Sequence, residues 1–278
     1  MNAVAFPADP PIDIGRVTQA RVALSEWTKF RSVRSTIYTF AVGVAATIVF
    51  AIVPALINAT RWPTMSLQDK LGFNPLETTV IGIGVAQLAL GVLGILMITG
   101  EYSTGMIRAT FTAVPTRLPV LWAKVGVYGT ITLIASLPAT LVAFFSAQSI
   151  LAGHTLFGRD ISLSLSDPGV ARVVMGGALY LTLVGLFGLG LGAIVRNTAG
   201  GIGAFVAILF VIPPVLTLLP SSWDDAISPY LPGNAGQAIM QFGVPDHTLG
   251  PWTGLALFTG YTAATIATAA VLLWRRDV

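Results

Sequence analysis

The residues of this chain that could do chemistry are few, and their spacing argues against catalysis. The two histidines, His154 and His247, lie far apart in predicted loops, and the chain has no cysteine. A metal site built on imidazole or thiolate is therefore not expected. The sequence also lacks a Gly-x-x-x-x-Gly-Lys-Ser/Thr phosphate loop, a Ser-His-Asp set and a His-Glu-x-x-His pattern. We predict a protein that is not an enzyme and that binds no cofactor of its own.

The segment 99–119 carries the polar groups best suited to recognition. It contains Glu101, Arg108 and Arg117, and it lies between two long apolar runs. A connection between two helices usually needs only a handful of residues. Because this one is long, partly apolar and charged, we expect a short helix that contacts a partner.

Composition places these residues in a membrane protein. The 278 residues are 54% hydrophobic and 10% charged, with a mean hydropathy of +0.80. Soluble domains carry about 25% charged residues, so this chain cannot cover a water-exposed surface and its solvent is the lipid bilayer. Its basic residues are not interleaved with aromatic residues on a polar face, which argues against a nucleic-acid partner.

Six apolar stretches are long enough to cross a bilayer, which needs about 20 residues. None has Asp, Glu, Lys or Arg in its core, and none alternates as a barrel strand does. We predict an all-α membrane domain over 17–278 behind a polar tail, 1–16. Its predicted spans are 37–57, 79–99, 121–150, 173–195, 201–219 and 252–274.

The distribution of basic residues predicts the orientation. One side has Arg16, Arg21, Lys29, Arg31, Arg34, Arg108, Arg117, Lys124, Arg196, Arg275 and Arg276. The other side has only Arg61, Lys70, Arg159 and Arg172. Basic loops stay in the cytoplasm, so we expect both termini and the segment 99–119 there.

The segment 17–34 is predicted to be an amphipathic helix in the membrane interface. Leu24, Trp27, Phe30 and Val33 recur at every third position among basic residues. Two interpretations remain open, a positive-inside anchor and a contact with a partner.

The spans also contain packing and capping signals. Gly188 and Gly192 have the spacing that lets helices approach closely, either within one chain or between two chains. Asn197 or Thr198 can cap the fifth span. The loop 221–251 keeps many large apolar residues, so two short helices are expected, one from Ser221 or Ser222 and one over 234–242.

Gln87 is the clearest polar side chain in the middle of a span. It can serve as a hydrogen-bond partner of a neighbouring helix or as a substrate contact. Ionisable groups inside a membrane mark proton and ion relays. Their absence from the span cores argues against a proton-coupled transporter and against an intramembrane hydrolase.

Three segments resemble the ABC-2 family of ABC transporter permeases, particularly those of actinobacterial type. They are EWTKFRSVRST at 26–36, ITGEYSTGMIR at 98–108 and GLGLGAIVRNTAG at 188–200. The likeness extends over essentially the whole chain. The Gly-Glu-Tyr-x-x-Gly-x-x-Arg pattern is fairly specific, whereas the apolar spans are not.

The resemblance implies a coupling helix that docks on a separate ATPase subunit. The predicted contact comprises Glu101, Tyr102, Ser103, Thr104, Gly105, Met106, Ile107 and Arg108. Its methionine and isoleucine would anchor it, and its two charged residues would orient it. The turn 196–200 would be a minor second contact. Two ATPases, which bind ATP and Mg²⁺, would join two permease chains, either identical or different.

The resemblance further implies an exporter in a bacterial plasma membrane. Its pathway would lie on the dimer axis, lined by the second and fifth spans through Gln87, Leu88, Gly91, Phe205, Leu209 and Ile212. Such a lining suits a hydrophobic or amphipathic drug, antibiotic, peptide or lipid-like molecule, so efflux and resistance are the expected roles. The alternatives are a non-transporting ABC-type module for mechanotransmission or resistance, and a secondary transporter or channel that works alone.

Overall fold

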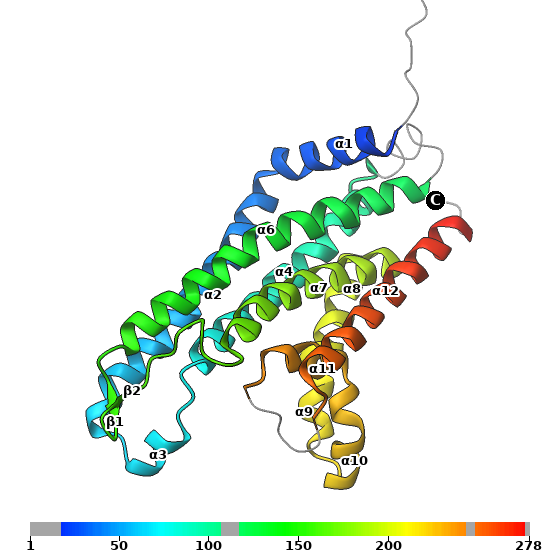
Figure 1. Cartoon of the computed structure of the whole chain (residues 1–278). Coiled ribbons are helices and arrows are strands. Elements are labelled where there is room, and N and C mark those ends of the chain that lie inside the picture. Colours follow the sequence, from blue (N-terminus) through cyan, green and yellow to red (C-terminus); the bar gives the residue numbers. More distant parts are fainter. Residues whose placement is uncertain (1–17, 107–116, 243–247, 276–278) are drawn as a thin grey trace, which may run out of the picture.

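The fold is a bundle of long apolar helices. A computed structural model describes residues 18–106, 117–242 and 248–275. Within these residues, six helical segments are long and apolar enough to cross a membrane, as the composition predicts. They are α2 (Arg34–Arg61), α4 (Glu77–Ser103), α6 (Arg117–Leu151), α7 (Val170–Val195), the pair α8 (Thr198–Val206) and α9 (Ile212–Leu216), and α12 (Pro251–Arg275) (Figure 1).

The two ends of the bundle differ in what they contain. One end, called here the α1 end, holds helix α1 (Gln19–Ser32), the end of α4, the start of α6 and the α7–α8 turn (Figure 1). The other, the α10 end, holds the short elements. These are η1 (Trp62–Thr64), α3 (Leu67–Gly72), β1 (Thr155–Leu156), β2 (Arg159–Asp160), α10 (Ser221–Ile227), η3 (Ser228–Tyr230), α11 (Pro232–Gln237) and η4 (Ala238–Met240).

A small β-ribbon departs from the all-α expectation. Strands β1 and β2 pair antiparallel, with Thr155 opposite Asp160. The two residues between them, Phe157 and Gly158, have φ of 50° and 77°. Positive φ at both positions is typical of the tight turn whose twist matches a hairpin. The ribbon is short and lies outside the apolar helices.

The central seam of the bundle is a close contact between α4 and α7. A Cβ added at Gly188 would overlap the carbonyl oxygen of Gly91, and one added at Gly94 would overlap that of Gly185. Gly192 likewise faces the backbone of Ile95. The glycine spacing of the fourth span therefore serves packing within the chain.

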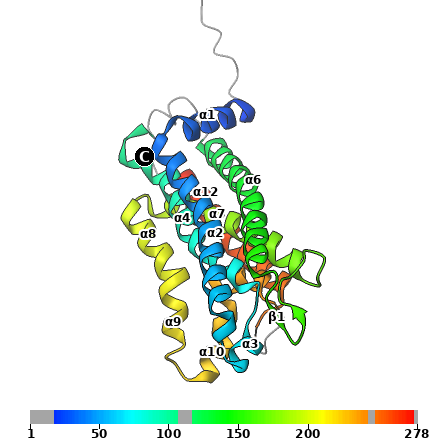
Figure 2. The same ribbon diagram turned by 90° about the vertical axis from the view of Figure 1, so that its left-hand side faces the viewer.

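The fifth predicted span is wrong in detail. Helix α8 gives way to a π-helical turn, η2 (Ala207–Val211), and α9 ends at Leu216, short of the predicted 219. Pro213 and Pro214 follow the turn, and proline cannot supply the amide that continues an α-helix. At its start, the Asn197 side chain accepts a hydrogen bond from the Gly200 amide, which confirms the predicted cap. Figure 2 shows α8 and α9 at one side of the bundle.

The two predicted short helices before the last span are present as α10 and as α11 with η4. Arg172 of α7 holds the end of η4 by donating to the carbonyl oxygens of Ile239, at 2.7 Å, and Gln241, at 2.9 Å. Gly254 of α12 lies directly against Ala235. The apolar residues of α11 and η4, among them Ile239 and Met240, are therefore buried between α7 and α12. Trp223 and Ile227 of α10 remain exposed.

Helix α1 buries a second stripe besides the apolar positions noted in the sequence. The buried residues are Val22, Glu26 and Phe30, which recur at every fourth position. Leu24 and Trp27 remain exposed. A spacing of four follows one stripe of an α-helix more closely than a spacing of three. The predicted helix is present, its place in the membrane interface stays a prediction, and Phe30 and a carboxylate point into the bundle.

Candidate functional site

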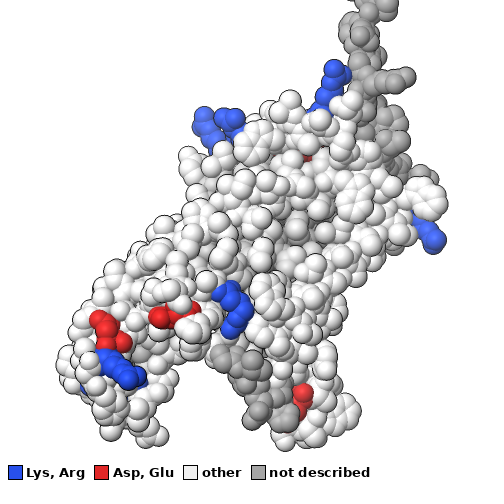
Figure 3. All heavy atoms as spheres, in the orientation of Figure 1, with Lys and Arg blue, Asp and Glu red and all other residues white. Residues whose placement is uncertain are grey.

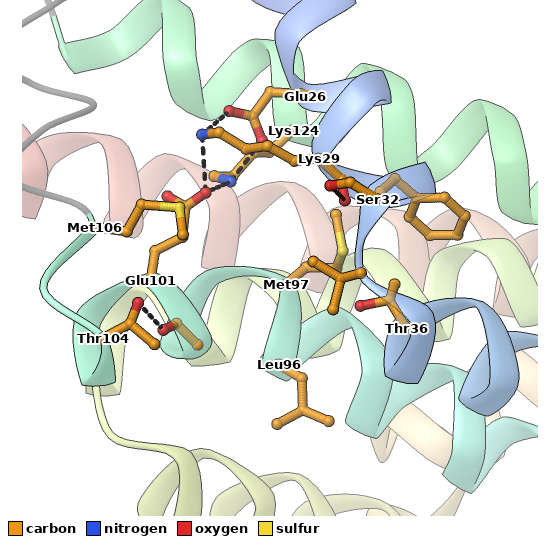
Figure 4. A pocket seen from close by; sticks show the side chains of 13 residues that line it. Glu26, Lys29, Ser32, Thr36, Leu96, Met97, Glu101, Thr104, Met106 and Lys124 are labelled. Carbon is orange, nitrogen blue, oxygen red and sulfur yellow. Dashed lines mark hydrogen bonds and ion pairs between the residues drawn. The ribbon is translucent and has the colours of Figure 1, made fainter.

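Four charged side chains from three helices meet at the α1 end. Lys124 of α6 lies 2.6 Å from Glu26 of α1 and 2.7 Å from Glu101 of α4, measured from Nζ to the carboxylate oxygens. Lys29 of α1 contacts the same two carboxylates at 2.7 Å and 3.0 Å. Figure 4 shows both lysines between the two glutamates. We call this set, Glu26, Lys29, Glu101 and Lys124, the ion cluster.

The ion cluster is largely withdrawn from water. The side chains of Glu26 and Lys124 are 1% and 2% exposed, and that of Glu101 is 10% exposed. Buried charges are tolerated only when they are paired and hydrogen-bonded, and here two positive charges face two negative charges. Burial by itself lowers the pKa of Lys29, but Glu26 and Glu101 outweigh it and hold this pKa above its ordinary value.

The local sequence explains why a carboxylate of α1 points inward. Val22 and Phe30 lie one turn before and one turn after Glu26, and both pack into the bundle. Thr18 fixes the start of the helix by accepting a hydrogen bond from the Arg21 amide. The apolar stripe therefore orients the helix, and the stripe carries Glu26 inside with it.

A cavity of about 270 Å³ lies beside the ion cluster, between α1 and the end of α4. Besides the four charged residues, Leu96, Met97, Thr104 and Met106 contribute to its wall (Figure 4). The Oε2 atom of Glu101 is buried and accepts no hydrogen bond within the part of the chain that the structure describes. One oxygen of this carboxylate is thus buried without a compensating hydrogen bond from the described residues, beside a partly apolar cavity.

The α7–α8 turn lies beside the end of α4. Arg196 adopts a left-handed φ of 57°, and its guanidinium carbon stands 5.4 Å from the ring centre of Tyr102. The same side chain donates to the Leu272 carbonyl at 3.2 Å. Thr198 donates to the Thr99 hydroxyl at 2.9 Å. The two segments that the sequence predicts to contact an ATPase therefore form one continuous surface.

The predicted contact residues divide into buried and exposed groups. Glu101 is buried in the ion cluster, and Tyr102 is half-buried. The exposed members are Ser103, Thr104, Gly105 and Met106. Ile107, Arg108 and the rest of the predicted coupling helix lie outside the described residues. The docking role of Glu101 remains a prediction, and the structure gives this carboxylate two partners inside the chain.

Most of the predicted pathway residues lie in the packed interior of the chain. Gln87, Gly91, Phe205 and Leu209 are buried. Only Leu88 and Ile212 are exposed, at 43% and 41%.

Gln87 has hydrogen-bonding partners inside the chain, and its predicted place in the translocation pathway stays a prediction. The Tyr180 hydroxyl of α7 donates to the Gln87 carbonyl oxygen, and the Gln237 amide donates to that hydroxyl at 3.4 Å. The prediction that Gln87 bonds to a neighbouring helix is confirmed.

Sequence reasoning missed the roles of Glu26, Lys29 and Lys124. In the sequence, Lys29 and Lys124 contribute only to the distribution of basic residues that predicts the orientation of the chain. The available signal was the spacing of Glu26, which lies four residues from Val22 and four residues from Phe30 in the sequence. Within the described ranges, no group of three or more His, Cys, Asp and Glu side chains could hold a metal ion.

Comparison with known proteins adds no family. No family model matches the chain, and no curated protein matches it.

Proposed function

We propose that this chain is the membrane-spanning subunit of an ATP-driven exporter of hydrophobic or amphipathic molecules. Its ATPase is a separate subunit, because the chain has no phosphate-binding loop of its own. ATP and Mg²⁺ are bound there. The basic excess at the α1 end supports a cytoplasmic orientation of that end. Two permease chains and two ATPases form the proposed unit.

The observation that supports this proposal most strongly is the ion cluster. It joins the end of α4, from which the predicted coupling segment leaves, to α1 and α6 through contacts of 2.6 to 3.0 Å. A force on that segment would move three helices together, because buried ion pairs resist separation. Since α1 leads directly into α2, the first span would follow. A joint that keeps these helices together suits a subunit driven by closure of its partners.

The surface beside the ion cluster suits the docking step. Figure 3 shows Lys and Arg exposed at the α1 end, where few acidic atoms reach the surface. The exposed residues from Ser103 to Met106 lie next to the α7–α8 turn and offer both polar and apolar groups. An ATPase groove with acidic and apolar walls would complement this surface.

Reconstitution with the cognate ATPase tests the proposal. Vesicles containing both proteins should expel a fluorescent hydrophobic substrate when ATP is supplied. Thr104→Arg should weaken stimulation of the ATPase, because the added side chain lies on the proposed docking surface. Thr64→Arg is the matched control, since Thr64 is an exposed threonine at the opposite end of the bundle and also donates to a nearby backbone carbonyl.

The same vesicles separate the competing functions. ATP hydrolysis that depends on this chain without substrate movement would favour a non-transporting module. Substrate movement by this chain in the absence of any ATPase would favour a secondary transporter or channel. Either result would overturn the proposal.

A further inference from the structure

An apolar groove runs between α1 and α6 on the outer side of the bundle, away from the cavity of the ion cluster. Its volume is about 590 Å³, which is within the range of about 300–1,000 Å³ typical of ligand pockets. The α1 wall is formed by Gln19, Ala23 and Trp27, which share one stripe of that helix. The α6 wall is formed by Trp122, Ala123, Gly126, Val127, Thr130, Ile131, Ile134 and Ala135.

The length of the groove matches one leaflet of a bilayer. The α6 wall extends from Trp122 to Ala135, and at 1.5 Å per residue this corresponds to about 20 Å. The hydrocarbon core of one leaflet is about 15 Å thick. Because α1 lies across the end of the bundle and α6 continues along it, the groove leads from the interface toward the bilayer interior (Figure 1). Trp27 and Trp122, which line the groove, belong to a residue type enriched at that interface.

The mouth of the groove is positively charged. Arg31 lies four residues beyond Trp27, and its guanidinium carbon stands 5.9 Å from the centre of the Trp27 ring. Arg21 and Arg31 are exposed, and no carboxylate in the described ranges forms an ion pair with either of them. The only carboxylate of α1, Glu26, is neutralised inside the ion cluster. The exposed charge of α1 is therefore purely basic.

We propose that this groove binds one anionic glycerophospholipid from the leaflet at the α1 end. One acyl chain lies along α6 over Gly126, and the phosphate contacts Arg31. Burial of methylene groups and attraction between basic side chains and anionic headgroups supply the affinity. A symmetric second copy of this chain is a poorer occupant, because it would bring its own exposed arginines to the same mouth.

Substitution of Gly126 tests whether the groove holds a lipid. A Cβ at Gly126 would meet no atom within 4 Å, so the side chain of Gly126→Phe starts in open space and occupies the groove. Gly260→Phe is the matched control, since Gly260 is an exposed glycine in α12 with equally open surroundings. The full chain is reconstituted with equal amounts of phosphatidylglycerol and phosphatidylcholine and washed in detergent. The lipid retained per chain is then measured by mass spectrometry.

The wild-type chain is expected to retain phosphatidylglycerol in preference to phosphatidylcholine. Gly126→Phe should reduce the retained phosphatidylglycerol by about tenfold, because several methylene contacts are lost, and Gly260→Phe should leave it unchanged. Arg31→Gln should reduce the preference by about fivefold, whereas Arg61→Gln at the opposite end should not. Arg31→Gln leaves the groove walls intact, so it tests the proposal even if Gly126→Phe fails to fold.

Three results would overturn the proposal. The first is equal retention of phosphatidylglycerol by the wild type and Gly126→Phe. The second is equal retention of both lipids by the wild type, which would remove the role of the arginines. The third is unchanged lipid content with loss of a dimer in Gly126→Phe, which would identify the occupant as a second copy of the chain.

Discussion

Helix α4 is held to its neighbours in two contrasting ways along its length. In its middle, Gly94 of α4 and Gly188 of α7 let the two backbones approach to direct contact. At its end, Glu101 pairs with lysines from α1 and α6. Lipid offers no hydrogen bonds, so close packing of small residues joins helices at membrane depth. Charged side chains are tolerated near the membrane–water interface, where part of the ion cluster meets water.

The glycine seam between α4 and α7 and the ion cluster should respond differently to a force applied by a partner subunit. The glycine seam has no side chains that can change rotamer, so its two helices move as one body or separate. The ion cluster has four long side chains and a cavity beside it, so its pairs can rearrange without separation of the helices. We infer that α4 and α7 form the fixed part of the subunit, and that the α1 end is where motion enters.

Substitution at the glycine seam should have the largest effect. Gly188→Leu places a side chain against the Gly91 carbonyl oxygen, and no rotamer relieves an overlap with backbone. The free energy of unfolding should fall by more than about 3 kcal/mol. The measurement is the yield and thermal unfolding of the purified chain in detergent. Gly84→Leu, at a glycine of the facing helix α4 that has open surroundings, should be close to the wild type. Equal behaviour of the two variants would contradict the seam.

Breaking the ion cluster should come next. Glu26→Gln leaves Lys124 with one carboxylate and gives the ion cluster a net positive charge. The expected loss of stability is about 3 kcal/mol, since an unbalanced buried charge is costly. Glu77→Gln, which removes an exposed carboxylate from the first turn of α4, is the control for charge alone. The readout is again the thermal unfolding of the purified chain.

A double substitution sharpens the same test. Glu26→Leu with Lys124→Met replaces the most buried pair by apolar groups and leaves Glu101 paired with Lys29. Such exchanges are often neutral for stability. Recovery of stability without recovery of transport would show that the charges serve function. A double variant as unstable as Glu26→Gln would contradict the view that imbalance of charge, rather than loss of the pair, is what destabilises the chain.

Gln87→Leu should have a smaller effect. The Tyr180 hydroxyl would lose its acceptor inside the bundle, which destabilises the chain by about 2 kcal/mol. Adding Tyr180→Phe should restore part of this loss, because the unsatisfied hydroxyl is then removed. A change in substrate preference with no change in unfolding would contradict this structural role and return Gln87 to the translocation pathway.

The sequence predicted the apolar elements better than the polar contacts. Spans could be found because lipid requires long uninterrupted apolar runs. The segment of α11 and η4 could be found because its apolar residues are buried, whereas α10 is present although Trp223 and Ile227 stay exposed. The predicted fifth span extends too far along the chain because the apolar run continues past Leu216, where α9 ends. The same run gives no sign of the π-helical turn that precedes Pro213 and Pro214. Apolar content gives the length of a run but not its hydrogen bonding.

The ion cluster could not be predicted in the same way. Glu101 is 72 residues from Lys29 and 23 from Lys124 in sequence, and nothing in either local pattern indicates the pairing. The charges of this end were counted for orientation, which depends on their number and not on their contacts. Only the spacing of four residues between Val22, Glu26 and Phe30 indicates that Glu26 faces inward.

The smallest predicted effect concerns the cap of α8. Asn197→Ala removes the acceptor for the Gly200 amide at 2.9 Å. Loss of an N-terminal cap destabilises a protein by about 1 kcal/mol. Amide hydrogen exchange should report the change as faster exchange confined to the first turn of α8. Uniform destabilisation of the whole chain would mean that α8 is more tightly integrated with the α4–α7 seam than its position at the side of the bundle indicates.

The most direct test of the account is the amount of substrate expelled per ATP hydrolysed in vesicles that contain the chain and its ATPase. Glu101→Gln should lower this ratio while ATP hydrolysis continues, because the segment after α4 is no longer tied to α1 and α6 by a balanced ion cluster. Glu101→Gln with Lys29→Gln restores the balance and should recover part of the ratio. A wild-type ratio in Glu101→Gln would contradict the claim that the ion cluster transmits the force.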